Sequence, residues 1–263
     1  MKRESKNSKL TDEDVKKYSR NFWKILIGFV ILGGLFLLSV RIGMFGKLPT
    51  FKDLENPKSN LASEILTDDN RVLGTYYVHN RSNVKYNQLS PYLVHALVST
   101  EDKRFYEHSG IDYSRTISTV LLTLSGNKQG GSTITQQLAL NLFGEQRARN
   151  SLKRIMQKFQ EWLTAVRLER NYTKEEIVMM YFNTVDFGAY NTFGIKSAAR
   201  TYFNTTPDKL NPAQAALLVG MLKGPGAYSP VRYPENALRR RNLVLQNMKS
   251  QNFISSEEFE KYK

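Results

Sequence analysis

The stretch Gly130–Asn141 reads GGSTITQQLALN. Two glycines let the backbone approach a ligand closely, and Ser132 and Thr133 then cap a new helix. The free amides and positive dipole end of such a helix start are a natural phosphate site. One helical turn separates Ser132 from Gln136, and a second row of Thr133 and Gln137 lies beside it. These hydroxyl and amide rows suit sugar and phosphate oxygens. Capping plus a polar surface explains the Ser and Thr, but not the paired Gln in a Leu- and Ala-rich helix.

Upstream, residues 101–110 read EDKRFYEHSG and contain a candidate general base. Glu101 follows the apolar stretch LVHALVST, so we expect it where a buried helix reaches the surface. A carboxylate that acts as a general base needs a partly desolvated cleft, which raises a carboxyl pKa toward neutrality. The alternatives are an exposed acid at a helix end for Glu101 and a structural histidine for His108.

Downstream, residues 151–170 predict one long helix with two faces. A row of Arg154, Lys158 and Glu161 follows at spacings of four and three. A basic row with one carboxylate is what a diphosphate leaving group needs, and a solvated charged face is the alternative. The predicted core stripe of the helix consists of Leu152, Ile155, Phe159, Trp162, Leu163 and Val166.

An apolar segment near the amino terminus, residues 22–45, predicts a transmembrane anchor. Lys24 and Arg41 flank the apolar run and can reach the two interfaces. A cleaved signal peptide is the alternative, but the run is long for a signal core and no convincing small-residue cleavage site follows it. Basic residues crowd its amino-terminal side, so we expect residues 1–21 to be a cytoplasmic tail and the rest to face outward.

Composition limits the partners of the outward part. The 263-residue chain has a net charge of +14 and no cysteine, so it lacks disulfides and thiolate metal sites. Residues 1–45 hold nine Lys or Arg and four Asp or Glu, which leaves +9 for the remainder. A basic domain tethered outside a membrane meets anionic lipid head groups and lipid-linked phosphates, and we expect no nucleic-acid partner.

The rest of the chain predicts a mainly α-helical domain with a small β element. Residues 46–62 predict a linker, and residues 63–78 predict a β-hairpin around an Asp-Asp-Asn turn. Helix starts are expected at Ser90-Pro91, Thr173 with Glu176, Asn211-Pro212, Pro234, and Ser255 with Glu258. We therefore divide the chain into a tail (1–21), an anchor (22–45), a linker with hairpin (46–89) and one helical domain (90–263).

Together these segments resemble the bacterial peptidoglycan glycosyltransferase family, found as the transglycosylase domain of class A penicillin-binding proteins and as monofunctional enzymes. The resemblance covers about residues 90–248, with the family motifs in order. The first two motifs match Glu101, Asp102, Phe105, His108, Gly110, Gly131, Ser132, Thr133, Gln136, Gln137 and Asn141. The later motifs match at Lys158 and Glu161, at Tyr181, Asn183 and Gly188, and at Ala215, Gly220 and Pro225.

The resemblance implies a lysozyme-like, mainly α fold with a membrane-dipping segment at residues 113–130. It implies an inverting enzyme that polymerises lipid II into β-1,4-linked glycan and releases undecaprenyl diphosphate at the bacterial plasma membrane. Glu101 would deprotonate the 4-hydroxyl of the acceptor, and Glu161 would position the diphosphate. Substrate-binding residues would be Asp102, Phe105, His108, Gly131, Ser132, Thr133, Gln136, Gln137, Asn141, Lys153, Arg154 and Lys158. No metal ligand or cofactor is required, Mg or Mn being optional, and further partners would be the growing glycan, the membrane and cell-wall synthesis proteins.

Two positions depart from the family pattern. Leu140 stands where the family usually has Lys, and Gln157 where it usually has Arg. Losing two charges beside a diphosphate weakens the stabilisation of developing negative charge. The neighbouring Arg149, Lys153, Arg154 and Lys158 are candidates to compensate.

Three other interpretations stay open at this point. A glycoside hydrolase also uses two carboxylates, but the anchor and the basic lining disfavour it. A non-catalytic lipid II-binding partner in wall assembly would fit the loss of charge at Leu140 and Gln157. The chain could also be the amino-terminal part of a bifunctional class A penicillin-binding protein, although no transpeptidase motif set is found in these residues.

Overall fold

The computed structural model describes residues 12–43, 63–66, 72–76, 83–125, 130–143, 150–188 and 192–263. The chain divides into two compact units, Met1–Leu48 and Pro49–Lys263. The predicted linker, residues 46–62, lies outside the described residues.

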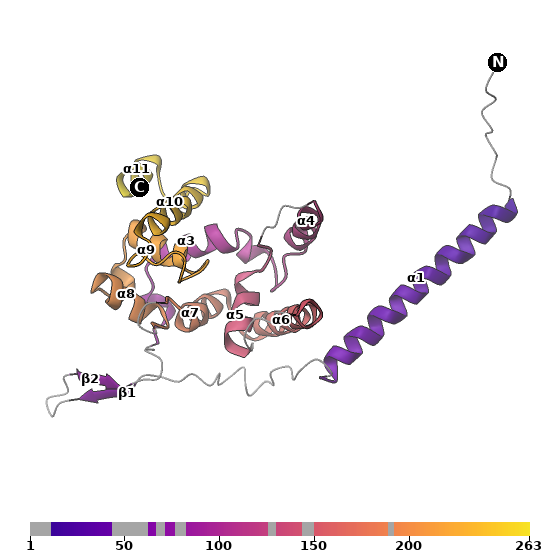
Figure 1. Ribbon diagram of the computed structural model, residues 1–263, viewed down its shortest axis with the longest axis horizontal. Helices are drawn as coiled ribbons and strands as arrows, with labels where there is room; N and C mark the ends of the chain where they lie inside the picture. The colour runs from indigo at the N-terminus through magenta and orange to yellow at the C-terminus, as the bar shows by residue number, and fades with distance from the viewer. Residues whose placement is uncertain are drawn as a thin grey trace, which may run out of the picture. The chain divides into compact units, whose positions relative to one another are not determined.

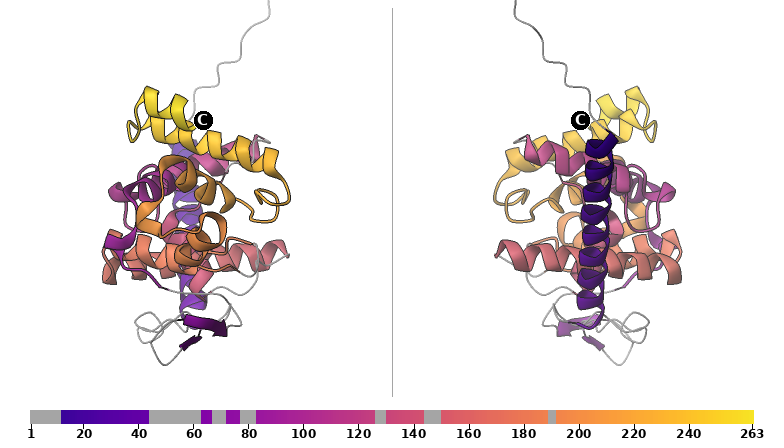
Figure 2. Two further views of the ribbon diagram at one scale, coloured as in Figure 1. Left: turned by 90° about the vertical axis from the view of Figure 1, so that its left-hand side faces the viewer. Right: turned by 90° about the vertical axis from the view of Figure 1, so that its right-hand side faces the viewer.

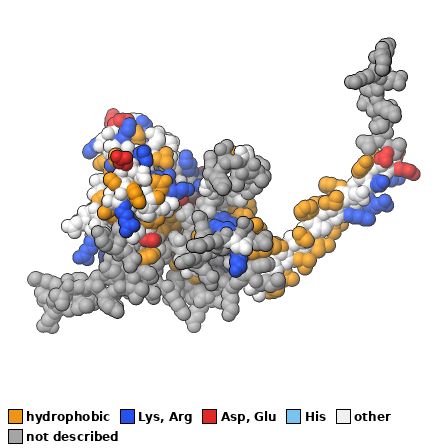
Figure 3. Space-filling view, in the orientation of Figure 1, with side chains coloured by type: hydrophobic (Ala, Val, Ile, Leu, Met, Phe, Trp, Pro, Cys, Tyr) orange, Lys and Arg blue, Asp and Glu red, His pale blue; other side chains and the backbone are white. Residues whose placement is uncertain are grey.

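The first unit contains one long helix, α1 (Asp12–Arg41). It starts inside the predicted tail because Asp12, Glu13 and Asp14 favour the positive end of the helix dipole. The turn after it includes Gly43, whose φ of 76° suits glycine. Figure 3 shows hydrophobic side chains along α1 and basic ones near its amino-terminal end. The helix is long and apolar enough to cross a membrane, as predicted for residues 22–45.

The second unit is mainly α-helical, as predicted (Figure 1). Its helices are α3 (Pro91–Glu101), α4 (Tyr113–Leu124), α5 (Ile134–Phe143), α6 (Ser151–Asn171), α7 (Lys174–Thr184), α8 (Ile195–Phe203), α9 (Pro212–Met221), α10 (Pro234–Ser250) and α11 (Ser256–Tyr262), with short 3-10 turns η1 (Tyr86–Gln88), η2 (Phe105–Glu107) and η4 (Pro207–Lys209).

The predicted β-hairpin is present. Strand β1 (Ser63–Leu66) pairs antiparallel with β2 (Val72–Tyr76), and Ser63 lies opposite Tyr76. The register shifts between Ile65 and Leu66, which marks a bulge or irregularity. The predicted Asp-Asp-Asn turn lies outside the described residues.

All five predicted helix starts are present, and three of them have capping boxes, whereas Ser90 and the residue before Pro234 make no side-chain cap. Thr173 accepts from the backbone N–H of Glu176, whose side chain binds back to Thr173, forming a capping box. Asn211 with Gln214 and Ser255 with Glu258 form the same arrangement. Such a cap stabilises a helix by about 0.5–2 kcal/mol, so these starts are specified locally.

Two groups of helices enclose the core. Helix α9 packs against α3 and α10, while α5 packs against α6 and α7. Figures 1 and 2 show α10 and α11 at one end of this unit and α6 at the opposite end. Phe105, Tyr181, Phe182 and Phe187 are among the largest fully buried side chains. Burying a side chain of this size contributes about 1.5–3 kcal/mol.

The predicted core stripe of α6 is wrong. Ile155 is 51% exposed, and the other described members of the stripe are only partly buried. The buried face instead contains Glu161, Thr164, Ala165 and Leu168. This face turns inward because α6 packs on α5 and because the backbone of Ala165 lies against the loop before α4.

Candidate active site

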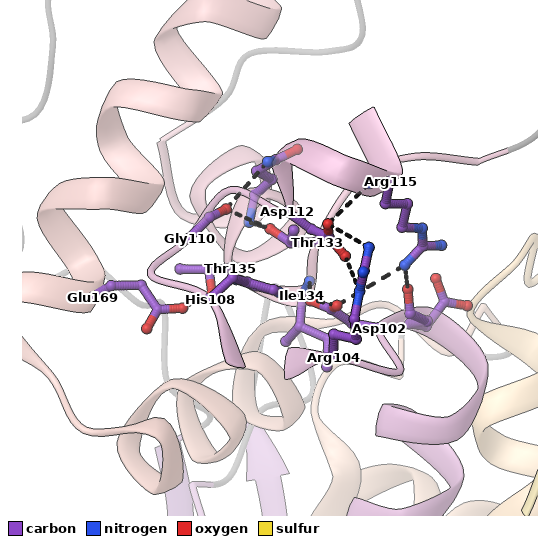
Figure 4. Close-up of polar contacts among 12 residues, drawn as sticks. Asp102, Arg104, His108, Gly110, Asp112, Arg115, Thr133, Ile134, Thr135 and Glu169 are labelled. Carbon is purple, nitrogen blue, oxygen red and sulfur yellow. Dashed lines mark hydrogen bonds and ion pairs between the residues drawn. The ribbon is translucent and has the colours of Figure 1, made fainter. Parts of the chain in front are cut away.

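Asp102, the residue after α3, organises the loop that leads to α4. Its side chain is fully buried and accepts the backbone N–H of Ile134 at 3.1 Å. The same carboxylate lies 3.1 Å from Nε2 of His108 and 4.0 Å from Arg115 (Figure 4). A buried carboxylate at the first residue of α5 caps that helix and satisfies an amide that has no partner within the helix. Asp102 therefore joins the two predicted motifs, and its contact with substrate stays a prediction.

Gly110 is hydrogen-bonded by two side chains from the start of α5. Its carbonyl accepts from Oγ1 of Thr133 at 2.8 Å and from Nε2 of Gln136 at 3.1 Å (Figure 4). Gly110 has a φ of +89°, and a Cβ built there would lie 2.9 Å from the backbone of Ala165. Thr133 also caps α5 as predicted, since it accepts from the N–H of Gln136. Thr133 and Gln136 are both buried, so in this structure they hold the loop.

A second layer supports this loop from α6 and α7. Lys174 donates to the carbonyl of His108 at 2.6 Å and pairs with Glu169 at 2.7 Å. Thr135 donates to Glu169 at 2.5 Å. The ammonium of Lys174 lies 4.3 Å from the ring centroid of Phe105, which is fully buried. Phe105 therefore anchors the predicted motif, and its contact with substrate stays a prediction.

Asp112 fixes the start of α4. Burial opposes its charge, yet the hydrogen bonds from the Arg115 backbone and the Arg104 guanidinium, with the charge of Arg104, keep its pKa below its ordinary value. Arg104 binds both carboxylate oxygens, at 3.0 and 2.7 Å. This pair holds the loop that carries His108 against α4 (Figure 4).

Glu101 lies at the last residue of α3, with its side chain 17% exposed, as the apolar stretch before it predicts. Its Oε2 accepts from Nε2 of Gln137 at 2.8 Å. Its Oε1 lies 4.0 Å from Arg240 and has no hydrogen bond within the described part of the chain. Arg115 holds the backbone here by donating to the carbonyls of Glu101 and Gly130, the latter at 2.9 Å. One carboxylate oxygen is thus hydrogen-bonded, and the other faces the more distant guanidinium of Arg240.

Glu161 is the centre of a second charged group. Its side chain is buried, and Arg154 and Lys158 bind its two oxygens at 2.6 and 2.8 Å. Lys158 also donates to Ser132 at 2.7 Å and to Gln136 at 3.0 Å. Ser132 thus binds this lysine instead of capping α5. The predicted row on α6 is confirmed as a connected basic group beside the start of α5.

Gln157 belongs to the same group. Its Oε1 accepts from Arg154 at 2.8 Å, next to the bond from Arg154 to Glu161. An arginine at this position would add a positive charge, whereas Gln157 accepts a hydrogen bond from the positively charged Arg154. Leu140 lies on α5 one turn beyond Gln136 and is partly buried.

The remaining predicted site residues lie around these groups. Gly131 precedes α5, and a Cβ there would lie 2.7 Å from Thr119, so only glycine fits without a shift. Asn141 and Lys153 are exposed, on α5 and α6. Within the described ranges no hydrogen bond or ion pair ties Asn141 or Lys153 to the charged groups. Their roles stay predictions.

A cavity of about 350 Å³ opens beside Arg240. The guanidinium of Arg240 lies 5.8 Å from the ring centroid of Tyr228, and its buried Nε has no hydrogen-bond partner among the described atoms. The same side chain lies 4.0 Å from Oε1 of Glu101, which itself does not line the cavity. The lining residues are Ala227, Tyr228, Asn236, Arg239, Arg240 and Leu243.

Consecutive residues of α5 join the two charged groups. Gln137 binds Glu101, and Gln136 binds Lys158 of the Glu161 group. The two charged groups therefore contact neighbouring residues at the start of α5. The arrangement places the carboxylate of Glu101 on one side and the basic residues Arg154 and Lys158 on the other.

Sequence reasoning missed several supporting residues. Arg115, Glu169, Lys174 and Arg240 come from four different elements, and no spacing within one segment connects them to Glu101 or His108. An arginine or a lysine on a helix is more often a solvated surface residue, so only their contacts reveal them.

Comparisons with known proteins identify the family of this chain. The family model described as transglycosylase matches residues 69–249. Penicillin-binding protein 1A of Aquifex aeolicus is 35% identical over 89% of this chain and 32% of its own length, and that of Streptococcus pneumoniae is 35% identical over 94% and 33%. Penicillin-binding protein 1A of Escherichia coli is 32% identical over 93% of this chain and 28% of its own. The crystal structure of penicillin-binding protein 1A from Haemophilus influenzae is similar with 21% identity and a TM-score of 0.43, covering 78% of this chain and 20% of its own.

The curated relatives are all much longer than this chain. The chain spans about a third of the length of the curated relatives that it matches. The family model nevertheless covers more than half of the chain, and it includes both charged groups and the loop between them. The chain therefore belongs to the transglycosylase family, the glycosyltransferases of peptidoglycan synthesis.

Proposed function

We propose that this chain polymerises lipid II into β-1,4-linked glycan strands and releases undecaprenyl diphosphate. The observation that carries the proposal is the pair of charged groups joined by Gln136 and Gln137. Glu101 has one oxygen open to an acceptor hydroxyl. Arg154 and Lys158 lie on the other side of the same helix start, where a diphosphate would be stabilised.

The chemistry assigned to Glu101 is general base catalysis. Its Oε1 takes the proton of the acceptor 4-hydroxyl as that oxygen attacks the anomeric carbon of the growing chain. The bond between the anomeric carbon and the diphosphate oxygen breaks, and its electron pair leaves with the diphosphate. Attack from the face opposite the leaving group inverts the anomeric centre from the α-linked diphosphate to the β-1,4 linkage.

The departing diphosphate needs positive charge held in place. Arg154 and Lys158 supply it, and Glu161 fixes both side chains through its two oxygens. Because the two cations already occupy the Glu161 oxygens, an optional Mg or Mn ion would have to bind chiefly through phosphate oxygens. Activity measured with and without EDTA tests this.

The membrane segment sets where the reaction occurs. Helix α1 would anchor the chain by a single pass, and the basic Lys16, Lys17, Arg20 and Lys24 would keep its amino end in the cytoplasm. The second unit would then face outward, where the lipid-linked substrate is presented. On α4, Tyr113 is 71% exposed and Ile117 61%, which suits contact with the membrane surface.

Polymerisation of labelled lipid II by the purified full chain in detergent tests the proposal. We expect polymer from the parent and a loss of about 10²–10⁴-fold in rate from Glu101→Gln, because the amide cannot accept the proton. Glu235→Gln, an exposed change in the first turn of α10, is the matched control and should keep full activity.

Two results would contradict this function. Lipid II binding without polymer from the parent would favour a non-catalytic partner in wall assembly, in keeping with Leu140 and Gln157. Release of soluble muropeptides from finished glycan would indicate a hydrolase.

A further inference from the structure

Tyr181 on α7 is a buried residue whose hydroxyl makes a defined hydrogen bond. Its side chain is 1% exposed, and its hydroxyl donates to Oε1 of Gln137 at 2.9 Å. Burial, and then the nearby charge of Glu101, raise the pKa of Tyr181 well above its ordinary value. The hydroxyl therefore stays protonated at neutral pH and can act as a donor.

The contact of Tyr181 determines which way the amide of Gln137 faces. An amide offers an acceptor oxygen on one side and a donor NH₂ on the other. With its oxygen bound to Tyr181, Gln137 presents its NH₂ to Oε2 of Glu101 at 2.8 Å. The reversed amide would place its acceptor oxygen against a carboxylate oxygen, which is also an acceptor. Only this orientation of the Gln137 amide pairs a donor with an acceptor both at Tyr181 and at Glu101.

We propose that Tyr181 is a positioning residue for the base: through Gln137 it holds Oε2 of Glu101 and leaves Oε1 to receive the acceptor hydroxyl. This inference rests on the proposed function. The rigid placement of the three groups supports it, because Tyr181 lies on α7, Gln137 on α5 and Glu101 at the end of α3. Helix α7 packs against α5, and a capping box fixes its start.

A residue that only positions the base should affect kcat and leave KM nearly unchanged. Tyr181→Phe keeps the buried ring and removes only the hydroxyl. The amide of Gln137 then loses the bond that orients it, and the carboxylate of Glu101 samples unproductive positions. Since a small misplacement of a reacting group is costly, we expect kcat to fall by about tenfold while KM stays within about twofold.

The test compares variants of the full chain in the lipid II polymerisation assay. A double-mutant cycle joins Tyr181→Phe to Gln137→Ala, since a residue that acts through Gln137 adds nothing once Gln137 is gone. Tyr202→Phe is the matched control, because it also removes a tyrosine hydroxyl hydrogen bond, here to the carbonyl of Phe187 at 2.8 Å. Thermal unfolding of each variant reports on stability.

The inference predicts a lower kcat for Tyr181→Phe, a double variant no slower than Gln137→Ala, and unchanged kcat for Tyr202→Phe. If the parent polymerises and Tyr181→Phe has parental kcat, or if the two losses multiply in the double variant, this inference is refuted while the proposed function stands. Absence of polymer from the parent refutes both together.

Discussion

Replacing Asp102 by alanine would test whether the buried carboxylate holds the site together. The change removes the acceptor for the N–H of Ile134 and for Nε2 of His108, and both lie in buried or nearly buried positions. A hydrogen bond to a charged group contributes about 1.5–3 kcal/mol, so two lost bonds cost about 3–6 kcal/mol. Arg115, 4.0 Å away and 29% exposed, adds little. For a domain of roughly 200 residues, each kcal/mol lowers Tm by about 2–4 °C, which gives a total of about 6–24 °C.

Circular dichroism melting of the full chain in detergent would measure this shift. Asp102→Asn keeps the shape and one acceptor oxygen, so we expect about half the loss. Glu260→Ala, an exposed change on α11, should stay within about 0.5 kcal/mol of the parent. If Asp102→Ala melts within about 2 °C of the Glu260→Ala control, the carboxylate does not hold the two segments and the reasoning is refuted.

Three further predictions follow from the site. Leu140→Lys adds a cation one turn from the phosphate-suited start of α5, and its polymerisation rate should rise on the order of tenfold; an unchanged rate would show that the missing charge is already replaced. Gly110→Ala meets backbone at 2.9 Å with φ at +89°, so urea unfolding should show a loss of about 1–3 kcal/mol or more, whereas Gly226→Ala, with open space around it, should be nearly neutral. Because the folded-state pKa of Asp112 is lowered, its stabilisation is present above the unfolded pKa and is lost as pH falls through the folded one. Acid unfolding should therefore be less steep in Asp112→Asn, and an identical acid profile would contradict this.

Local features of the fold could be read from the residues themselves. Capping boxes at Thr173 and Ser255 depend on side chains three residues apart, and the apolar run of α1 depends on composition over one segment. The connection between Glu161 and the basic row is of the same kind, since helix geometry brings residues three and seven apart to one side.

Other expectations failed or stayed open because they depend on which surface another element covers. The apolar residues of α6 predicted a core stripe, but α5 and the loop at Gly110 meet the opposite face, where Ala165 allows close approach. Thr133 was expected to face a ligand, yet it turns inward to the Gly110 carbonyl.

By itself, the sequence determined the membrane-suited helix, the mainly helical domain with its hairpin and capped helices, and the residue types that make up the two charged groups. These depend on contacts within a few residues, whose geometry any helix imposes. Only the tertiary structure decided that Gln137 binds one oxygen of Glu101, that Tyr181 donates to Gln137 and that Arg240 approaches Glu101. These contacts join residues 36 to 139 positions apart, and their energy depends on packing between helices that no local pattern encodes.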